Sequence, residues 1–505
     1  MTEPFYITTA ISYPNGPPHI GHAYEAIAAD AIARFMRAQG RDVRFQTGTD
    51  EHGLKMAQAA RAEGAEPRVY AQRMSLLFKE MCDILNVSYD RFIGTSEEGH
   101  YRASQAIWSA MAAKGDLYLD SYAGWYSVRD EAFYEEGELT EGEGGAKLSP
   151  NGAPVEWTEE ASWFFRLSNY QQKLLDLYAA HPEFIQPDSR RNEVLRFVEG
   201  GLKDLSISRT SFDWGVPVPK GADSSDDHVM YVWLDALTNY ITGLGYPDDT
   251  ELWREYWPAA LHLIGKDVVR FHAVYWPAFL MSAGIPLPKQ VFGHGFLLSR
   301  GEKMSKSVGN VVDPMVLAER FGVDALRYFL LREVPFGQDG SYSAEAIVTR
   351  ANAELANSFG NLAQRTLSMI FKNLDGIIPP AGEAAEDLKL LATVSSAFTD
   401  DMPQAFEKYA FSVGIEAWMK AVFACNAYVD AMAPWALRKT DPERMVAVLG
   451  TLAAAIGQLA LAIAPVIPES SARLLAAIAA GDNGQPIAQP VPLFPRLELG
   501  EGDPE

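Results

Sequence analysis

Apolar side chains recur three and four positions apart within residues 19–40, HIGHAYEAIAADAIARFMRAQG, and this spacing predicts an amphipathic helix that stops at Gly40. The apolar positions are Ile20, Tyr24, Ile27, Ala31 and Phe35. The preceding run PFYITTA, residues 4–10, is rich in β-forming residues and predicts a short strand. His19 and His22 therefore stand at a strand-to-helix junction, where free N–H groups and the positive end of the helix dipole favour an anion.

Strand and helix patterns alternate up to about residue 115, which predicts a doubly wound α/β sheet of parallel strands with crossover helices. Residues 41–53, RDVRFQTGTDEHG, predict a strand and then a turn, with a helix from about Lys55. The polar residues of that turn are Thr47, Thr49, Asp50, Glu51 and His52. Because ligands bind beyond the carboxyl ends of strands in such sheets, the loops with His19 and Asp50 are candidate site segments.

The pattern changes near residue 116, where aromatic and acidic residues alternate before a Gly/Pro-rich loop. This texture predicts an insertion of antiparallel hairpins with two short helices, up to about residue 225. The α/β pattern resumes near His228. From residue 344 onward we expect four or five Ala/Leu-rich helices, separated at residues 374–382, 399–406 and 438–444.

Length, composition and net charge limit the classes of protein to which the chain can belong. A chain of 505 residues is too long for one core. It has two cysteines, no uninterrupted apolar run of membrane-spanning length and no basic leader, so we expect a cytoplasmic protein without disulfides or a membrane span. The net charge of −23 argues against nucleic-acid binding by charge alone, although residues 187–197 and 362–373 are candidate basic patches.

A second candidate anion site follows in EKMSKSVGN, residues 302–310, where Lys303 and Lys306 can reach one anion from a Gly/Ser-rich loop. Taken alone, each short motif is equally compatible with a surface turn. The chain has no GxxxxGK[ST] sequence, which excludes a P-loop ATPase on its own motif.

HIGH at residues 19–22 and KMSKS at residues 303–307 are the two signature motifs of class I aminoacyl-tRNA synthetases, and the chain resembles that family. TTAISYPNGPPHIGH, TGTDEHG, GGLKDLSISR, YVWLDALTNY, IGKDVVRFHAVYWPA and GEKMSKSVGN resemble the methionine-specific branch and together cover most of residues 5–335. The resemblance implies a Rossmann-like catalytic domain with a connective insertion, followed by an all-α anticodon-binding bundle. The implied boundaries are 1–115 and 226–300 for the catalytic halves, 116–225 for the insertion, 301–343 for the KMSKS loop and linking segment, 344–490 for the bundle and 491–505 for a tail.

The implied reaction is ligation of L-methionine to initiator and elongator methionine tRNA, with ATP and Mg²⁺ as the substrate complex. Methionine attacks the α-phosphate, pyrophosphate leaves, and the methionyl-adenylate passes its acyl group to tRNA with release of AMP. His19, His22, Lys303 and Lys306 would be the catalytic residues, acting by positioning and charge stabilisation. The resemblance implies an ATP site formed by His19, Gly21, His22, Gly265, Asp267, His294, Gly295, Leu297, Lys303, Ser305 and Lys306.

The implied methionine pocket is apolar and aromatic, as suits a flexible thioether. Its residues would be Ile11, Tyr13, Asp50, Trp233, Ala236, Leu237, Tyr240, Val268, Phe271, His272 and Trp276. Asp50 would bind the substrate ammonium, and Tyr13 and His272 would supply polar contacts near the sulfur. Leu237 replaces the proline expected from the family. From sequence alone, Trp276 suits core packing as well as it suits pocket lining.

Many relatives carry zinc knuckles in the insertion, but this chain has no cysteine or histidine between Gly115 and Ala180, and Ser127 and Ser149 stand where thiolates are expected. Since structural zinc needs thiolate or imidazole ligands, we expect no structural metal. The chain also stops before the OB-type domain through which some relatives dimerise, so we expect a monomer.

Asn361 and Arg365 are four positions apart on a predicted helix, and Trp435 follows a helix-initiating proline. The resemblance implies that all three read the anticodon, because an indole and a guanidinium can stack on splayed-out bases. The alternative for Trp435 is a buried tryptophan at a helix start.

Three other functions remain open at this stage. A sister enzyme for valine, leucine or cysteine is disfavoured because the insertion of about 110 residues is short for an editing domain and the chain is poor in cysteine. A nucleotidyltransferase of similar fold would lack the C-terminal helices. A catalytically dead RNA-binding paralogue would not need His19, His22, Lys303 and Lys306.

Overall fold

The structure is a computed structural model and describes residues 2–129, 132–220, 227–299, 302–304, 311–482 and 484–500. The chain forms two compact units. The first consists of Met1–Pro18, Gly40–Cys82 and Tyr89–His294, and the second of His19–Gln39, Asp83–Ser88 and Gly295–Glu505.

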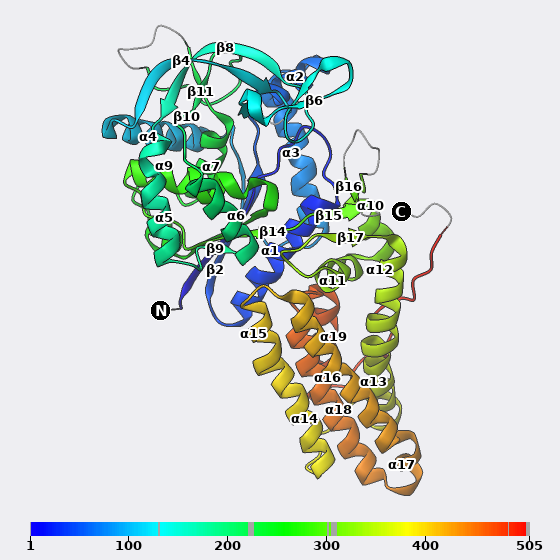
Figure 1. The fold of residues 1–505 in the computed structure, drawn as a ribbon. Helices are drawn as coiled ribbons and strands as arrows, with labels where there is room; N and C mark the ends of the chain where they lie inside the picture. Colours follow the sequence, from blue (N-terminus) through cyan, green and yellow to red (C-terminus); the bar gives the residue numbers. More distant parts are fainter. Residues whose placement is uncertain are drawn as a thin grey trace. The chain divides into compact units, whose positions relative to one another are not determined.

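A six-stranded parallel sheet forms the centre of the first unit, and three of its strands, β2, β9 and β14, are labelled in Figure 1. The strand order is β3-β2-β1-β13-β14-β9. Its strands are β1 (Pro4–Thr9), β2 (Asp42–Thr49), β3 (Arg91–Gly94), β9 (Ile185–Gln186), β13 (Ala260–Gly265) and β14 (Gln290–His294). β1 is central, with Tyr6 opposite Ala260 on one side and Phe5 opposite Val43 on the other. The predicted doubly wound α/β sheet is confirmed.

Helices cover this sheet and bury large aromatic side chains against it. They are α2 (Leu54–Ala62), α3 (Pro67–Ile84), α4 (Glu98–Lys114), α7 (Val232–Thr242), α8 (Glu251–Tyr256) and α9 (Trp276–Ala283). α4 packs against both α7 and α9. Fully buried Tyr6, Tyr240, Trp257 and Trp276 belong to one continuous core cluster of this unit.

The segment predicted as an insertion is built on a long antiparallel pair, β4 (Leu117–Ser127) with β8 (Glu156–Phe165). The shorter strands are β5 (Ala132–Tyr134), β6 (Thr140–Glu141), β7 (Lys147–Leu148), β10 (Leu205–Ser206), β11 (Ser208–Arg209) and β12 (Val229–Met230). Two helices follow the hairpins, α5 (Gln171–Ala180) and α6 (Asp188–Glu199), as the pattern predicts. Between them β9 pairs with β14 of the parallel sheet, so the chain returns to that sheet inside the predicted insertion.

The second unit combines α1 (Ile20–Ala38), a small sheet and a helical bundle. The sheet has the order β16-β15-β17, with β15 (Leu297–Ser299), β16 (Glu302–Lys303) and β17 (Gly340–Tyr342). Between β16 and β17 the chain forms α10 (Pro314–Phe321) and α11 (Val323–Glu333). After β17 come α12 (Ala344–Arg350), the π-helix η7 (Ala351–Gly360) and α13 (Asn361–Asn373). The chain continues with α14 (Ala385–Ser396), η8 (Ala397–Asp401), α15 (Met402–Phe406), α16 (Phe411–Met432), α17 (Pro434–Thr440), α18 (Pro442–Ile463) and α19 (Pro468–Asp482).

Two local predictions are wrong. Thr47 and Thr49 lie inside β2 rather than in the turn, which begins at Asp50. Residues 399–406 do not separate helices, because the π-turn η8 runs directly into α15. Pro403 lies directly after this π-turn, inside a continuous helical run, so the proline does not end the helix.

α18 is the one helix among the described residues that is long and apolar enough to cross a membrane. Its most apolar window is 67% buried inside the protein, and the helix packs against α14, α16, α17 and α19. These contacts identify α18 as the core helix of the bundle, in agreement with the prediction from its glycine and proline interruptions.

Candidate functional site

The predicted methionine-site residues of the first unit follow the carboxyl ends of its parallel strands. Ile11 and Tyr13 come after β1, Asp50 comes directly after β2, and the segment with Val268 follows β13. Because parallel strands end at one edge of a sheet, these segments share that edge, which is where ligands of doubly wound sheets bind.

The loop that carries Asp50 is fixed by backbone and side-chain bonds on both sides. The Asp50 amide donates to the Ser12 carbonyl over 2.8 Å, which ties the loop to the segment after β1. Glu51 N–H donates to Thr95 Oγ1 over 2.8 Å, and the Trp214 indole N–H donates to the Glu51 carbonyl over 2.6 Å. With 8% of its surface exposed, Asp50 is a rigidly held and nearly buried carboxylate, as an ammonium-binding residue requires.

Aromatic residues predicted for the methionine pocket lie on α7 and on the π-turn η6 (Phe271–Tyr275). The Trp233 ring stacks parallel to the Phe271 ring, with centroids 3.8 Å apart. Tyr240 and His272 are joined by a hydrogen bond of 2.6 Å between Oη and Nε2. A π-turn adds a residue to the helical repeat and is frequent at functional sites, and here it places Phe271 and His272 beside α7.

His272 is a neutral imidazole with both nitrogens in use. Burial lowers the pKa of His272 to about 4, against a hydrogen bond to the Val268 carbonyl that raises it. Since that carbonyl can only accept, Nδ1 carries the proton over 2.9 Å, and Nε2 accepts from the Tyr240 hydroxyl. His272 is therefore bonded through both nitrogens and holds the Tyr240 hydroxyl in place.

Trp276 and His262 lie beneath this pair and are fully buried. The His262 ring stacks on Tyr240 at 4.1 Å, and Trp276 contacts Tyr240 at 6.4 Å between centroids. In the part of the chain that the structure describes, the Trp276 indole N–H has no hydrogen-bond partner. Of the two sequence-based alternatives for Trp276, complete burial favours core packing, with the indole supporting the pocket from below.

The remaining predicted pocket residues divide into two groups. Ala236 and Leu237 are buried on α7, and Val268 packs on the same core cluster as Trp233 and Phe271. Tyr13 instead packs in a smaller cluster against α2, where its hydroxyl accepts from the Met56 amide over 3.1 Å. Ile11, in the segment that follows β1, is partly buried.

The HIGH segment begins α1 in the second unit, with His19 as the N-cap. Gly21 N–H donates to His19 Nδ1 and His19 N–H donates to His22 Nδ1, each over 3.1 Å, and the two ring centroids are 3.8 Å apart. Both Nδ1 atoms accept, so a neutral ring carries its proton on Nε2. An anion would therefore meet two imidazole donors rather than the first-turn amides, which bond within the unit.

Glycine at position 21 is explained by the same geometry, because a Cβ there would lie 2.9 Å from Cε1 of the His19 ring. Gly295 has a different cause, since its Cβ would lie 2.2 Å from the Gln338 carbonyl. Close approach of the chain to itself thus accounts for Gly295, without a ligand. In the first unit, a Cβ on Gly265 would lie 2.8 Å from Oδ1 of Asp267, which is exposed in the short helix η5 (Lys266–Val268).

The structure describes only some of the other predicted ATP-site residues. His294 is buried at the end of β14 in the first unit, and Leu297 is buried in β15 of the second. The backbone of Lys303 lies in β16, which pairs antiparallel with β15. Ser305 and Lys306 lie outside the described residues.

The predicted anticodon residues gather on the helical bundle. Asn361 and Arg365 are exposed on the first two turns of α13, and Trp435 is 49% exposed at the start of α17. The Arg365 guanidinium carbon lies 5.4 Å from the centre of the Trp435 ring. This exposure rules out the alternative of a buried helix-start tryptophan.

No group of three or more His, Cys, Asp or Glu side chains is placed to hold a metal ion in the described ranges. Ser127 and Ser149 are fully buried, and the Ser149 hydroxyl accepts from the Ala153 amide over 3.2 Å. Ser149 thus closes its turn by a hydrogen bond, and the lack of structural zinc stays a prediction.

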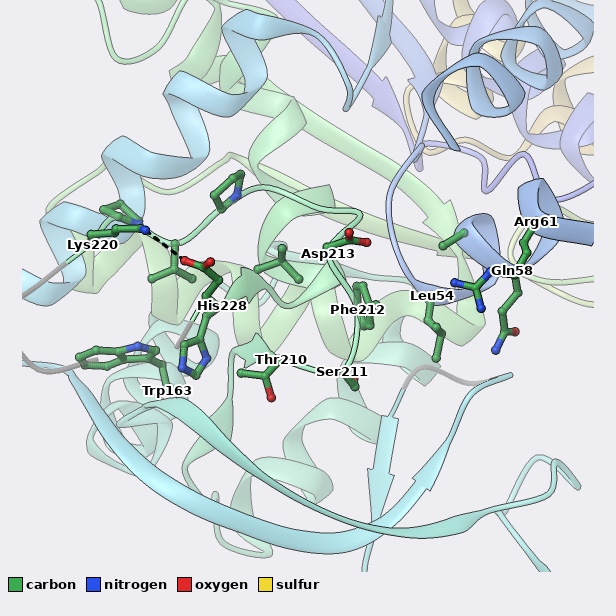
Figure 2. Close-up of a pocket in the computed structure, with 16 residues that line it drawn as sticks. Leu54, Gln58, Arg61, Trp163, Thr210, Ser211, Phe212, Asp213, Lys220 and His228 are labelled. Carbon is green, nitrogen blue, oxygen red and sulfur yellow. Dashed lines mark ion pairs between the residues drawn. The ribbon is translucent and has the colours of Figure 1, made fainter. Parts of the chain in front are cut away.

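A cavity of about 740 Å³ in the first unit contains none of the predicted residues (Figure 2). Leu54, Gln58 and Arg61 line it from α2, and Thr210, Ser211, Phe212 and Asp213 line it from the loop after β11. Lys220 and Asp227 pair across 3.1 Å at its rim. Its lining residues are spread over the sequence without a repeated spacing, so no sequence signal identified the cavity.

The chain is similar to known proteins over nearly its whole length. The family model described as tRNA synthetases class I (M) matches residues 5–367, and the one described as the anticodon binding domain of methionyl tRNA ligase matches residues 378–500. The chain is 57% identical to a methionine–tRNA ligase of Brucella suis biovar 1 over 508 residues, 98% of each chain. A second methionine–tRNA ligase, from Mesorhizobium japonicum, is 59% identical over 475 residues, 94% of this chain and 91% of the relative.

Among solved structures, Mycobacterium tuberculosis methionyl-tRNA synthetase in complex with methionyl-adenylate has a TM-score of 0.93 and 55% identity, covering 98% of this chain and all of that one. The apo form of the same enzyme has a TM-score of 0.86 at 50% identity and covers 99% of each chain. The fold, the two signature motifs and these matches together show that the chain belongs to the methionine–tRNA ligase family of class I aminoacyl-tRNA synthetases.

Proposed function

We propose that this chain ligates L-methionine to methionine tRNA with ATP. The methionine carboxylate attacks the α-phosphorus of ATP, the bond to the bridging oxygen breaks, and pyrophosphate leaves. A terminal ribose hydroxyl of tRNA then attacks the carbonyl carbon of methionyl-adenylate, and AMP leaves. The observation that carries the proposal is 55% identity over 98% of the chain to a structure with methionyl-adenylate bound.

The methionine pocket that we propose joins a carboxylate to an aromatic wall. Asp50 accepts the substrate ammonium in charge-assisted hydrogen bonds. Trp233, Phe271 and Tyr240 surround the thioether, and sulfur–aromatic contacts contribute about 0.3–1.5 kcal/mol each. The fixed Asp50 loop and the paired Tyr240 and His272 support this assignment, since both are ordered before a ligand binds.

For the ATP site we propose that His19 and His22 donate from Nε2 to the phosphate–ribose region, and that Lys303 and Lys306 bind the leaving pyrophosphate. ATP would enter as its Mg²⁺ complex. The support is that Nδ1 of each imidazole accepts from a backbone amide, that of Gly21 for His19 and that of His19 for His22, so the ring proton is on Nε2. Because these donors act on charge that develops in the transition state, they would raise the rate of activation more than the affinity for methionine.

The decisive experiment is pyrophosphate exchange with each of the twenty amino acids. We expect exchange with methionine alone at low substrate concentration, and strong exchange with another amino acid instead would overturn the proposal. Lys306→Ala should lower methionine-dependent exchange by about 100- to 1000-fold and leave methionine binding nearly intact. Lys389→Ala, which removes an exposed lysine from α14, is the matched control and should change neither.

For the anticodon we propose that Trp435 stacks on a base while Arg365 and Asn361 bond its edge or a neighbour. Trp435→Ala should leave adenylate formation unchanged and lower kcat/KM for tRNA by about 5- to 150-fold, since stacking contributes about 1–3 kcal/mol per base. Phe423→Ala is the control, because Phe423 is 54% exposed on α16 and has no assigned role. Equal losses in both variants, or parallel loss of adenylate formation, would contradict the assignment.

The finer expectations belong to the same proposal. We propose that the chain acts as a cytoplasmic monomer on both initiator and elongator tRNA, without structural zinc. The buried serines at the predicted knuckle positions support the absence of zinc, since hydroxyl groups are poor ligands for a tetrahedral structural site.

A further inference from the structure

A carboxylate with two imidazoles is buried outside the residues assigned above. Asp235 Oδ2 lies 2.7 Å from His52 Nδ1, and Asp235 Oδ1 lies 2.6 Å from His100 Nε2. All three side chains are at most 1% exposed. His52 Nε2 is bonded to the Tyr101 hydroxyl over 2.9 Å, and His100 Nδ1 to Thr242 Oγ1 over 3.1 Å. Every nitrogen of both rings therefore has a partner.

The carboxylate keeps its charge in spite of burial. Burial alone raises the pKa of Asp235. His52 and His100 lower it by their charges and their hydrogen bonds, and together they outweigh burial and bring the pKa to about 2. An ionised group in such surroundings is tolerated only when its partners stay in place. The network therefore fixes the positions of the elements that supply its side chains relative to one another.

Those elements carry the two halves of the proposed methionine site. His52 is two residues after Asp50 in the same loop, and Asp235 is on α7 between Trp233 and Ala236. His100 is on α4 and ties α7 to that helix. The Trp214 indole packs edge-on against His52 at 5.0 Å, which keeps the imidazole turned toward α7.

We propose that His52 and Asp235 are positioning residues that set the spacing between the ammonium-binding carboxylate of Asp50 and the thioether pocket on α7. This inference rests on the proposed function. A methionine molecule must reach both sites at once, so a shift of the loop relative to α7 weakens amino-acid binding. ATP makes no use of this spacing, and its KM is unaffected.

The test uses substitutions that keep or remove one bond. In His52→Gln the amide replaces Nε2 and the bond to Asp235 is lost, whereas in His52→Asn the amide replaces Nδ1 and the bond is kept. For His100, which uses Nε2, the roles are reversed: His100→Asn loses the bond and His100→Gln keeps it. Each variant is measured for melting temperature and for KM and kcat in methionine-dependent pyrophosphate exchange.

We expect His52→Gln to raise KM for methionine by about tenfold or more, the ratio that follows from losing about 1.4 kcal/mol of charge-assisted hydrogen bonding. KM for ATP should stay within about twofold, and His52→Asn should restore methionine KM. His100→Asn should lower the melting temperature without this change in KM. An unchanged methionine KM in His52→Gln, or an equal rise in His100→Asn, would show that the cluster is structural only. Lack of methionine exchange by the unmodified protein would refute the proposed function instead.

Discussion

Replacing Arg327 with methionine should destabilise the second unit strongly, because this arginine is a fully buried charge with every donor group in use. Arg327 on α11 and Asp30 on α1 are both 0% exposed, and Arg327 Nη2 lies 2.6 Å from Asp30 Oδ2. The other guanidinium bonds go to four backbone carbonyl oxygens, those of Leu85, Asn86, Pro465 and Val466. One side chain therefore joins three segments that are distant in sequence.

The magnitude follows from what the substitution leaves behind. Methionine fills much of the volume but leaves the carbonyls without their donor and Asp30 without its main counter-charge. Removing one partner of a buried ion pair costs about 3–5 kcal/mol. Asp30 keeps bonds from Arg34 over 2.7 Å and from Ser88 N–H over 2.7 Å, so its charge is still partly compensated. We expect a loss of about 3 kcal/mol, at the lower end of that range.

Hydrogen exchange resolved by peptide is the suitable assay, because it reports the free energy of opening for each unit separately. Amides in α1, α11 and α19 should lose protection in Arg327→Met, while those of the parallel sheet should not. Arg73→Met is the matched control, since Arg73 pairs with Glu63 at the surface with both side chains at least half exposed. Such pairs contribute about 0–1 kcal/mol.

Two outcomes would refute the reasoning. A loss below about 1 kcal/mol in Arg327→Met would mean that the buried pair carries no more than a surface pair. Losses that add in the double variant Asp30→Asn/Arg327→Met would mean that the two side chains act independently, whereas contacting residues should show a coupling of about 0.5–3 kcal/mol.

Three further predictions address protonation, the C-terminal segment and metal content. Because the pKa of His272 is about 4 in the folded protein and near 6.5 when unfolded, the free energy of unfolding should fall as the pH drops from 6.5 to 4, and His272→Gln should reduce that slope by up to about 1.4 kcal/mol per pH unit. Asn352→Ala removes two hydrogen bonds of 2.8 Å to the backbone of Leu497, so residues 484–500 should become susceptible to limited proteolysis. Asn373→Ala is the control and should not have this effect, because the side-chain amide of Asn373 donates to a carbonyl of its own helix. Elemental analysis should give well under one zinc per chain, and a chelator should not lower the melting temperature; stoichiometric zinc would overturn the interpretation of the serines.

Local patterns explain how much of the fold could be predicted from sequence. The three-and-four spacing from Ile20 to Phe35 predicted α1 and its end near Gly40, because the buried face of an amphipathic helix appears in the sequence as a regular apolar spacing. Alternation of strands and helices likewise predicted the parallel sheet. The break expected at residues 399–406 is wrong because the helical run continues through the π-turn η8 into α15, and no local spacing in the sequence indicates such a turn.

The site was predictable only where short motifs carry the chemistry. Each of the motifs HIGH and KMSKS is an unbroken stretch of sequence. In the network at Asp235, by contrast, His52 and His100 are 183 and 135 positions away from the carboxylate, and no local spacing indicates such a contact. The π-turn at Phe271 has no local sequence signal either, since packing decides whether a helical turn contains an extra residue. For Gly295 the structure adds a cause that the motif does not show, because a Cβ there would lie 2.2 Å from the Gln338 carbonyl.

The net charge of −23 still allows local basic groups on the helical bundle. Arg332, Arg350 and Arg444 are each held by carboxylates in ion pairs of the bundle. Arg365 makes no ion pair with any of the described residues and lies over the exposed Trp435 ring. A guanidinium above an indole attracts phosphate and presents a flat surface to a base at the same point. The RNA contact that we propose would therefore depend on one charge without an ion-pair partner and one aromatic face, both of which an acidic protein can supply.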